Sequence, residues 1–232
     1  MRIEESIESV KQLVASARAA GKTVGFVPTM GALHRGHLSL IEAAAGRCDF
    51  VVVSIFVNPT QFGPSEDLDK YPKDIAADSK LCEDAGVDLI FAPAASEMYP
   101  DENVRWVTVE GLTENLCGRS RPDHFRGVTT VCAKLFDIVK SDIAFFGQKD
   151  AQQAVIIKRM VCDLNLPLEI EVCPTVREAD GLALSSRNRY LTADERKDAS
   201  LLYAGLKECE KCAFAGTTDA QKLISVMKSV IN

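Results

Sequence analysis

Residues 50–57 read FVVVSIFV, an unbroken apolar run rich in β-branched side chains that ends at the turn-forming pair Asn58–Pro59. Such a run is typical of a central strand that is covered on both faces, because a strand with one face in water would alternate apolar and polar residues. A sheet whose middle strand is hidden on both sides needs helices above and below it. The flanking segments therefore decide which architecture the chain has.

Strands and helices alternate on both sides of this run. Upstream, helical spacing of apolar residues predicts a helix over 7–17 capped at Gly21, a short strand over 24–27 stopped by Pro28, and a helix over 37–45. Downstream, the predicted elements are helix 75–85, strand 89–92, helix 128–139, strand 143–146, helix 151–164 and strand 169–172. This alternation predicts an α/β fold, a Rossmann-like doubly wound parallel sheet with helices on both faces.

The pattern changes after Pro174. A loop-rich stretch, VREADGLALSSRNRYL, is followed by two predicted helices without a strand between them. Thr192 with Glu195, and Thr218 with Gln221, have the spacing of capping boxes and mark the two helix starts. We therefore expect one domain over 1–175 and a small helical or α+β domain over 176–232, which is too short to bury much core by itself.

Composition excludes several classes of function. Acidic residues number 33 against 27 Lys plus Arg, so the net charge of −6 offers no basic field that would gather nucleic acid. No apolar run has the length of a membrane span, and the first ten residues carry three glutamates where a signal peptide needs an apolar core. Eight scattered cysteines in a chain of this length predict reduced thiols and a cytoplasmic location.

One cysteine pair, Cys209 and Cys212, has the CxxC spacing of zinc and redox sites. The pair falls inside a charged helical pattern, no second CxxC accompanies it, and no histidine follows position 124 to complete a zinc site. We interpret the pair as structural, and the other six cysteines as small core residues.

In open α/β sheets, ligands bind where the strands end, so the loops that follow predicted strands are the candidate site. The first such loop, PTMGALHRGH at 28–37, places His34 and His37 where a strand turns into a helix. Gly31 and Gly36 let the backbone approach a ligand, and the helix start offers unpaired amides to a phosphate. A shared metal ion is the alternative, although no carboxylate or third histidine lies nearby in sequence.

Three further loops carry polar groups to the same edge. NPTQF at 58–62 offers Asn58 and Gln61, and FFGQKDAQQ at 145–153 offers a glycine, a lysine, an aspartate and two glutamines. LSSR at 184–187 combines two hydroxyls with a guanidinium, which suits a phosphate clamp. Asp78, on the helix after NPTQF, is a weaker candidate for a Mg²⁺ contact, and we leave it out of the predicted site.

Taken in order, PTMGALHRGH, NPTQF, FFGQKD and PTVREADGLALSSRNRYL resemble the pantoate–β-alanine ligases, also called pantothenate synthetases, of the nucleotidyltransferase superfamily. The resemblance extends from about residue 22 to residue 191. It implies a ligase of pantothenate (coenzyme A precursor) biosynthesis: pantoate attacks the α-phosphate of ATP to give pantoyl adenylate and pyrophosphate, and β-alanine then displaces AMP. It also implies Mg²⁺ as cofactor and a homodimer in the cytoplasm, with no nucleic-acid or membrane partner.

The resemblance also implies roles for single residues. The implied catalytic residues are His34, His37, Lys149 and Arg187, and the implied pantoate-binding residues are Gln61 and Gln153, with Gln61 also near β-alanine. The implied ATP-binding residues are Met30, Gly31, Ala32, Leu33, His34, Arg35, Gly36, His37, Gly147, Gln148, Lys149, Asp150, Val176, Leu184, Ser185, Ser186 and Arg187. On this basis 1–175 is the nucleotide-binding and catalytic domain, and 176–232 is a C-terminal lid domain shorter than is usual in the family. The metal ligands are not assigned.

Three alternatives stay open. The chain could be another adenylyl- or cytidylyltransferase, which would keep the histidines without needing Gln61 and Gln153. It could be a metal-dependent hydrolase that uses His34, His37 and His124. It could also be a non-catalytic ATP-binding module, which would bind nucleotide without releasing pyrophosphate.

Overall fold

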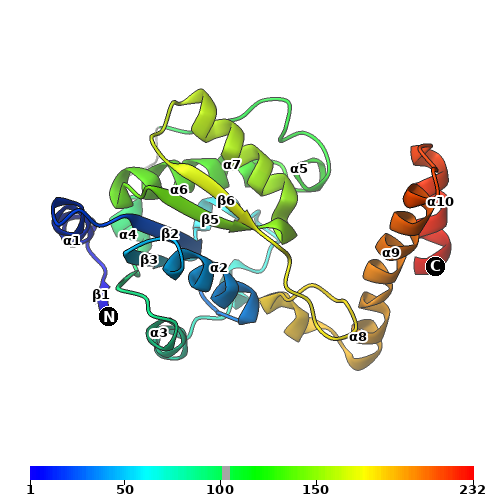
Figure 1. Ribbon diagram of the computed structural model, residues 1–232, viewed down its shortest axis with the longest axis horizontal. Coiled ribbons are helices and arrows are strands. Elements are labelled where there is room, and N and C mark those ends of the chain that lie inside the picture. Colours follow the sequence, from blue (N-terminus) through cyan, green and yellow to red (C-terminus); the bar gives the residue numbers. More distant parts are fainter. Residues whose placement is uncertain (101–104) are drawn as a thin grey trace. The chain divides into compact units, whose positions relative to one another are not determined.

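The computed structural model describes residues 1–100 and 105–232, which form two compact units, Met1–Pro174 and Thr175–Asn232. The first unit contains a parallel sheet with the order β1-β4-β3-β2-β5-β6 (Figure 1). Its strands are β1 (Arg2–Glu4), β2 (Val24–Thr29), β3 (Phe50–Ile55), β4 (Leu89–Phe91), β5 (Ile143–Gly147) and β6 (Glu169–Cys173). The predicted α/β class and parallel sheet are confirmed.

Helices connect these strands on both faces of the sheet. In the described part of the first unit they are α1 (Ile7–Ala19), α2 (Arg35–Ala45), α3 (Ile75–Asp84), α4 (Ala95–Met98), α5 (Cys117–Ser120), α6 (His124–Val139) and α7 (Ala151–Asp163). Three short 3₁₀ turns, η1 (Pro59–Gln61), η2 (Leu68–Lys70) and η3 (Gln148–Asp150), lie in the loops. Among the described residues, no helix is both long and apolar enough to cross a membrane.

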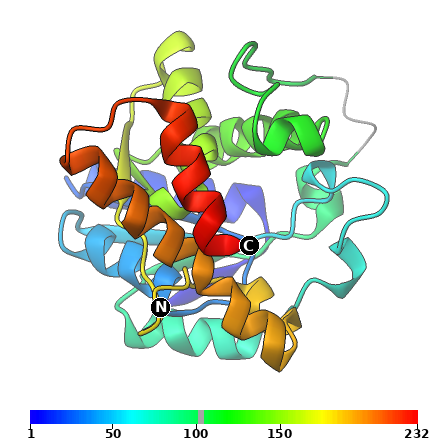
Figure 2. The ribbon, with the colours of Figure 1, turned by 90° about the vertical axis from the view of Figure 1, so that its right-hand side faces the viewer.

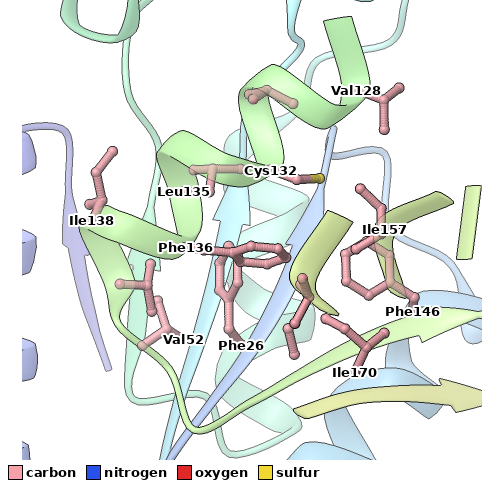
Figure 3. Packing of buried hydrophobic residues seen from close by; sticks show 14 of the residues in the cluster. Phe26, Val52, Val128, Cys132, Leu135, Phe136, Ile138, Phe146, Ile157 and Ile170 are labelled. Atoms are coloured by element: carbon pink, nitrogen blue, oxygen red, sulfur yellow. The ribbon is translucent and has the colours of Figure 1, made fainter. Parts of the chain in front are cut away.

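Side chains of alternating direction along each strand divide the core into two clusters. On one face, Phe26 and Val52 pack with α1, α6 and α7, and Phe26 meets the ring of Phe136 edge to face with centroids 6.4 Å apart (Figure 3). On the other face, Val27 and Val53 pack with α2 and α3. Figure 1 shows α6 and α7 on one side of the sheet and α2 and α3 on the other. The sheet is therefore covered on both sides, as the FVVVSIFV run indicates.

Two details of the predicted strands were wrong. The strand at 24–27 does not stop at Pro28 but continues to Thr29 and pairs with β3 along its whole length. Proline fits there because β2 pairs with β5 only at Gly25 and Phe26, so a missing amide at Pro28 breaks no ladder on that side. The short edge strand β1, which pairs with β4, was not predicted because three residues carry too little pattern.

The second unit contains a loop and three helices, α8 (Ala193–Ala199), α9 (Leu201–Phe214) and α10 (Ala220–Ile231), where two were predicted. The capping box of Thr192 and Glu195 is confirmed. The one predicted at Thr218 is wrong, because the carboxylate of Asp219, one residue later, accepts the amides of Gln221 and Lys222. Helices α9 and α10 pack side by side (Figures 1 and 2).

The start of α6 lies directly against η1. A Cβ atom added at Gly127 would stand 2.3 Å from the Thr60 carbonyl oxygen, far inside contact distance. Asn58, buried at the start of η1, donates its side-chain amide to the Gly127 carbonyl at 3.2 Å. Only a glycine allows the two backbones to come this close.

We therefore expect Gly127→Ala to lower the free energy of unfolding by about 2 kcal/mol, the usual cost of overpacking a rigid contact. Urea denaturation measures the difference. Gly46→Ala is the matched control, because its added Cβ atom would lie 3.4 Å from the nearest atom in ordinary helical backbone, and its stability should stay within about 0.5 kcal/mol of the parent. Equal losses in the two variants would contradict the close approach of α6 to η1.

Candidate functional site

The loop after β2 is held in shape by a buried carboxylate on another helix. Gly31 and Ala32 both have positive φ, +82° and +52°, so the chain turns sharply at Met30–Leu33. Asp78, in the first turn of α3 and 3% exposed, accepts the Ala32 amide at 2.9 Å and the Leu33 amide at 2.7 Å. These two bonds compensate for an alanine in left-handed backbone.

The two predicted histidines stand together at the start of α2. His34 is the N-cap and its Nδ1 accepts the Gly36 amide at 3.1 Å, while Nδ1 of His37 accepts the His34 amide at 3.3 Å. The ring centroids are 4.1 Å apart. Because Nδ1 accepts in each ring, Nε2 carries the proton of the neutral form. The arrangement presents two N–H donors at the positive end of a helix dipole, which suits an anion.

His37 is held in its neutral form. Burial lowers the pKa of its ring to about 3, and the neighbouring His34 and Lys149 act in the same direction. Removal from water disfavours the charged form, and nearby cations add to that effect. At neutral pH, His37 is therefore a hydrogen-bond donor without charge.

Lys149 reaches this region from the adjacent strand. Gly147 ends β5, and Gln148, Lys149 and Asp150 form η3 at the start of α7. Lys149 is exposed and pairs with Asp150 at 3.2 Å, and its charge is one cause of the lowered pKa of His37. The strand ends of β2 and β5 thus bring the predicted residues at 30–37 and 147–150 to the same edge of the sheet.

The side chain of Gln61 is held by two neighbouring residues, Asn58 and Met30. Asn58 donates to Gln61 Oε1 at 3.1 Å, which turns the amide nitrogen of Gln61 toward Met30 Sδ at 3.2 Å. Asn58 itself is 1% exposed and also accepts from Tyr99 at 2.9 Å. The sequence identified Asn58 only as a polar loop residue. In the structure it positions the side chain of Gln61.

The two glutamines at the start of α7 have different environments. Gln152 accepts the Cys117 amide at 3.0 Å and donates to the Leu112 and Asn115 carbonyls, so its side chain holds the segment before α5. Gln153, the predicted substrate residue, is half-buried next to it. Its role stays a prediction.

The remaining predicted residues belong to the second unit. The Leu184 amide donates to the Val176 carbonyl at 3.0 Å, and Ser185 caps the 3₁₀ helix η4 (Ser186–Tyr190) by accepting the Arg187 amide at 3.3 Å. Arg187 is exposed. These contacts order the LSSR loop within its own unit, and its assignment to the nucleotide site stays a prediction.

A histidine-based metal centre gains no support. Among residues 1–100 and 105–232, no group of three or more His, Cys, Asp or Glu side chains could hold a metal ion. All eight cysteines lie in these ranges as free thiols, and Cys209 donates to the Leu223 carbonyl. The prediction of six core cysteines is right for Cys82, Cys132 and Cys173, whereas Cys48 and Cys117 are half-buried and Cys162 faces solvent near the end of α7.

The sheet is Rossmann-like, and two histidines and a lysine lie in the loops that follow its neighbouring strands β2 and β5. These features define a class of α/β protein that binds phosphate-bearing ligands at its strand ends. The family model described as Pantoate-beta-alanine ligase matches residues 2–232. The chain belongs to this family.

Individual relatives agree with the family match. A pantothenate synthetase of Acetivibrio thermocellus is 56% identical over 223 residues, which cover 96% of this chain and 79% of the relative. The crystal structure of pantothenate synthetase from Thermus thermophilus matches with a TM-score of 0.93 at 46% identity, covering 100% of this chain and 82% of that one. A pantoate-beta-alanine ligase from Francisella tularensis, complexed with beta-gamma ATP and beta-alanine, matches with a TM-score of 0.87 at 37% identity, covering 99% and 86%.

Asp78→Asn should loosen the loop after β2. An asparagine amide would point N–H groups at a backbone N–H, so one buried donor loses its acceptor and the free energy of unfolding falls by about 1–3 kcal/mol. Urea denaturation and faster hydrogen exchange at the Ala32 and Leu33 amides measure the effect. Asp84→Asn, on the exposed face of the same helix, should change neither quantity. Unchanged exchange in Asp78→Asn would contradict the role given to Asp78.

The neutral state of His37 has a measurable consequence in the ligand-free protein. Its ring proton resonances should show no titration between pH 8 and about pH 4, because its pKa is about 3. Because this pKa is lower in the folded than in the unfolded chain, the contribution of His37 to stability is present above pH 6.5 and is lost as pH falls toward 3. A midpoint near 6.5 in the NMR titration would contradict this account.

Proposed function

We propose that this protein joins pantoate to β-alanine with the use of ATP, through a pantoyl adenylate. Membership of the pantoate-beta-alanine ligase family supports this reaction, as does the Francisella tularensis relative complexed with beta-gamma ATP and beta-alanine. The observation that carries the proposal is the pair His34 and His37 at the start of α2, with Lys149 at the next strand end.

In the first step, a pantoate carboxylate oxygen attacks the α-phosphorus of ATP and the bond to pyrophosphate breaks. Negative charge grows on the α-phosphate oxygens and on the departing pyrophosphate. The Nε2–H groups of His34 and His37 and the ammonium of Lys149 are donors of the kind that stabilise such charge. Because His37 is neutral, it donates a hydrogen bond without first needing a proton from solvent.

In the second step, the amine of β-alanine attacks the acyl carbon of the adenylate, AMP leaves with the electron pair of the broken C–O bond, and the amine gives up a proton. Gln61 and Gln153 are the proposed pantoate residues. A neutral amide can bind the hydroxyl and carboxylate oxygens of pantoate without forming a strong ion pair, so the carboxylate stays reactive. Gln61 suits this role because Asn58 fixes the direction of its amide.

The proposal also includes residues of the second unit as nucleotide ligands. Val176, Leu184, Ser185, Ser186 and Arg187 would complete the nucleotide site, with Arg187 providing a guanidinium for phosphate oxygens. A lid role of 176–232 would shield the mixed anhydride from water. The support for both is the sequence motif and the ordered LSSR loop.

Mg²⁺ belongs to the same proposal. The described residues offer no protein cage for a metal, and both carboxylate oxygens of Asp78 accept backbone amides. This donor set fits an ion carried by the ATP phosphates, with Asp150 as the carboxylate beside the proposed phosphate-binding lysine. When bound, Mg²⁺ would offset the phosphate charge. A homodimer and a cytoplasmic location are also proposed, the latter from the eight free thiols.

The alternative reactions gain less support. The metal hydrolase needs His34, His37 and His124 on one ion, and no such group exists among the described residues. Transfer of a nucleotide to a different acid gains less support because the family model that matches residues 2–232 is described as Pantoate-beta-alanine ligase.

We expect exchange of labelled pyrophosphate into ATP that depends on pantoate and Mg²⁺ and proceeds without β-alanine.

Gln153→Ala should raise the KM for pantoate about tenfold, the effect of losing one good hydrogen bond, and leave the KM for ATP nearly unchanged. Lys149→Ala should instead lower the exchange rate about 10²–10³-fold, because it removes a donor to the transition state.

Steady-state exchange kinetics of the three proteins check these outcomes. Exchange that proceeds equally well without pantoate would overturn the proposed acid. Equal changes in both KM values for Gln153→Ala would remove that residue from the pantoate site.

A further inference from the structure

A polar cluster outside the predicted site holds the main chain of Gln61. His124, the first residue of α6, stands with Nδ1 2.8 Å from the Gln61 carbonyl oxygen. Its Nε2 is 3.2 Å from a guanidinium nitrogen of Arg121, the C-cap residue that directly follows α5. A second nitrogen of Arg121 also donates to the Gln61 carbonyl, at 3.5 Å.

The partners of His124 determine its tautomer. Arg121 can only donate, so Nε2 of His124 must accept and carries no hydrogen. The carbonyl of Gln61 can only accept, so Nδ1 must carry the hydrogen and donate it. The ring is therefore neutral, with its single N–H directed at the main chain of Gln61.

The Arg121 side chain is itself fixed. Glu66 accepts its Nε at 2.7 Å and also its terminal nitrogen, and both side chains are about three quarters buried. This ion pair lowers the pKa of the Glu66 carboxyl, so it stays ionised. Burial and the two-pronged contact make the pair a rigid support for the imidazole.

Packing leaves Gln61 little freedom to adjust. Helix α6 approaches η1 so closely at Gly127 that no Cβ fits between them. Asn58 and Met30 hold the side chain of Gln61, and His124 holds its carbonyl. A shift of that carbonyl would move the Gln61 amide away from its direction.

We propose that His124 is a positioning residue for pantoate: its Nδ1–H bond to the Gln61 carbonyl, supported by Arg121 and Glu66, fixes the main chain from which the Gln61 amide, directed by Asn58, binds the acid. The inference rests on the proposed function, because it takes Gln61 as a pantoate ligand. It gives the third histidine of the chain a role through Gln61 and not through a metal ion.

The test compares His124→Asn with His124→Phe. Asparagine places an amide nitrogen near the position of Nδ1 and can keep the donor, whereas phenylalanine keeps the ring shape and loses it. In pantoate-dependent pyrophosphate exchange, His124→Phe should raise the KM for pantoate about tenfold, and the KM for ATP should stay within about twofold. His124→Asn should stay within about threefold of the parent for both substrates.

Glu66→Gln weakens the ion pair that fixes Arg121 and leaves the imidazole of His124 unchanged. It should raise the KM for pantoate about threefold. An unchanged KM for pantoate in His124→Phe, or equal impairment of His124→Asn, would overturn the inference. If His124→Phe does not fold, Glu66→Gln decides, and an unchanged KM there would overturn it.

The controls separate this inference from the proposed function. No pantoate-dependent exchange by the parent protein would overturn both. Exchange by the parent with an unchanged KM for pantoate in Gln61→Ala would overturn the inference and the pantoate role of Gln61 but leave the proposed reaction standing, because the amide that His124 positions would then not bind the acid.

Discussion

The site depends on the parallel pairing of β2 with β3 on one side and with β5 on the other. The chain leaves β2 toward α2 on one face and leaves β5 toward α7, whose side chains pack on the other. The loops after these two neighbouring strands therefore diverge, and their polar residues face the same edge. His34 and His37 come from one loop and Lys149 from the other, so the ladder between two short strands sets which groups can act together.

Positioning of the site comes from residues that are distant in sequence. Asp78 lies 46 positions after Ala32, and His124 lies 63 positions after Gln61. Each bonds to main chain, so each fixes where a loop runs and not only where one side chain points. Asn58 and Gln152 also bond to main chain, Asn58 at Gly127, 69 positions away, and Gln152 at Asn115, 37 positions away. The groups proposed to touch substrate are thus held by a layer of buried or half-buried polar side chains.

The sequence predicted the parallel sheet except its edge strand β1, the longer helices of the first unit and the loops that carry the candidate site, because apolar periodicity and glycine-bearing turns are local signals, whereas β1, α4 and α5 are too short to show a pattern. It did not predict the role of Asp78, since an aspartate in the first turn of a helix has the same pattern whether it faces solvent or a loop. His124 was considered only as a metal ligand, because its contacts with Arg121 and Gln61 exist only after folding. Thr218 failed as a cap because Asp219, a competing cap residue, stands next to it.

The neutral state of His37 ties ligand binding to proton exchange with the buffer. An anion placed against the ring favours the charged imidazole, so phosphate groups bound as proposed would raise the pKa of His37 from about 3. If the raised pKa came close to the ambient pH, the protein would take up part of a proton as nucleotide binds and return it when pyrophosphate departs. The heat of nucleotide binding would then depend on the ionisation enthalpy of the buffer, and calorimetry in several buffers would give the net number of protons taken up, to which this buried ring contributes.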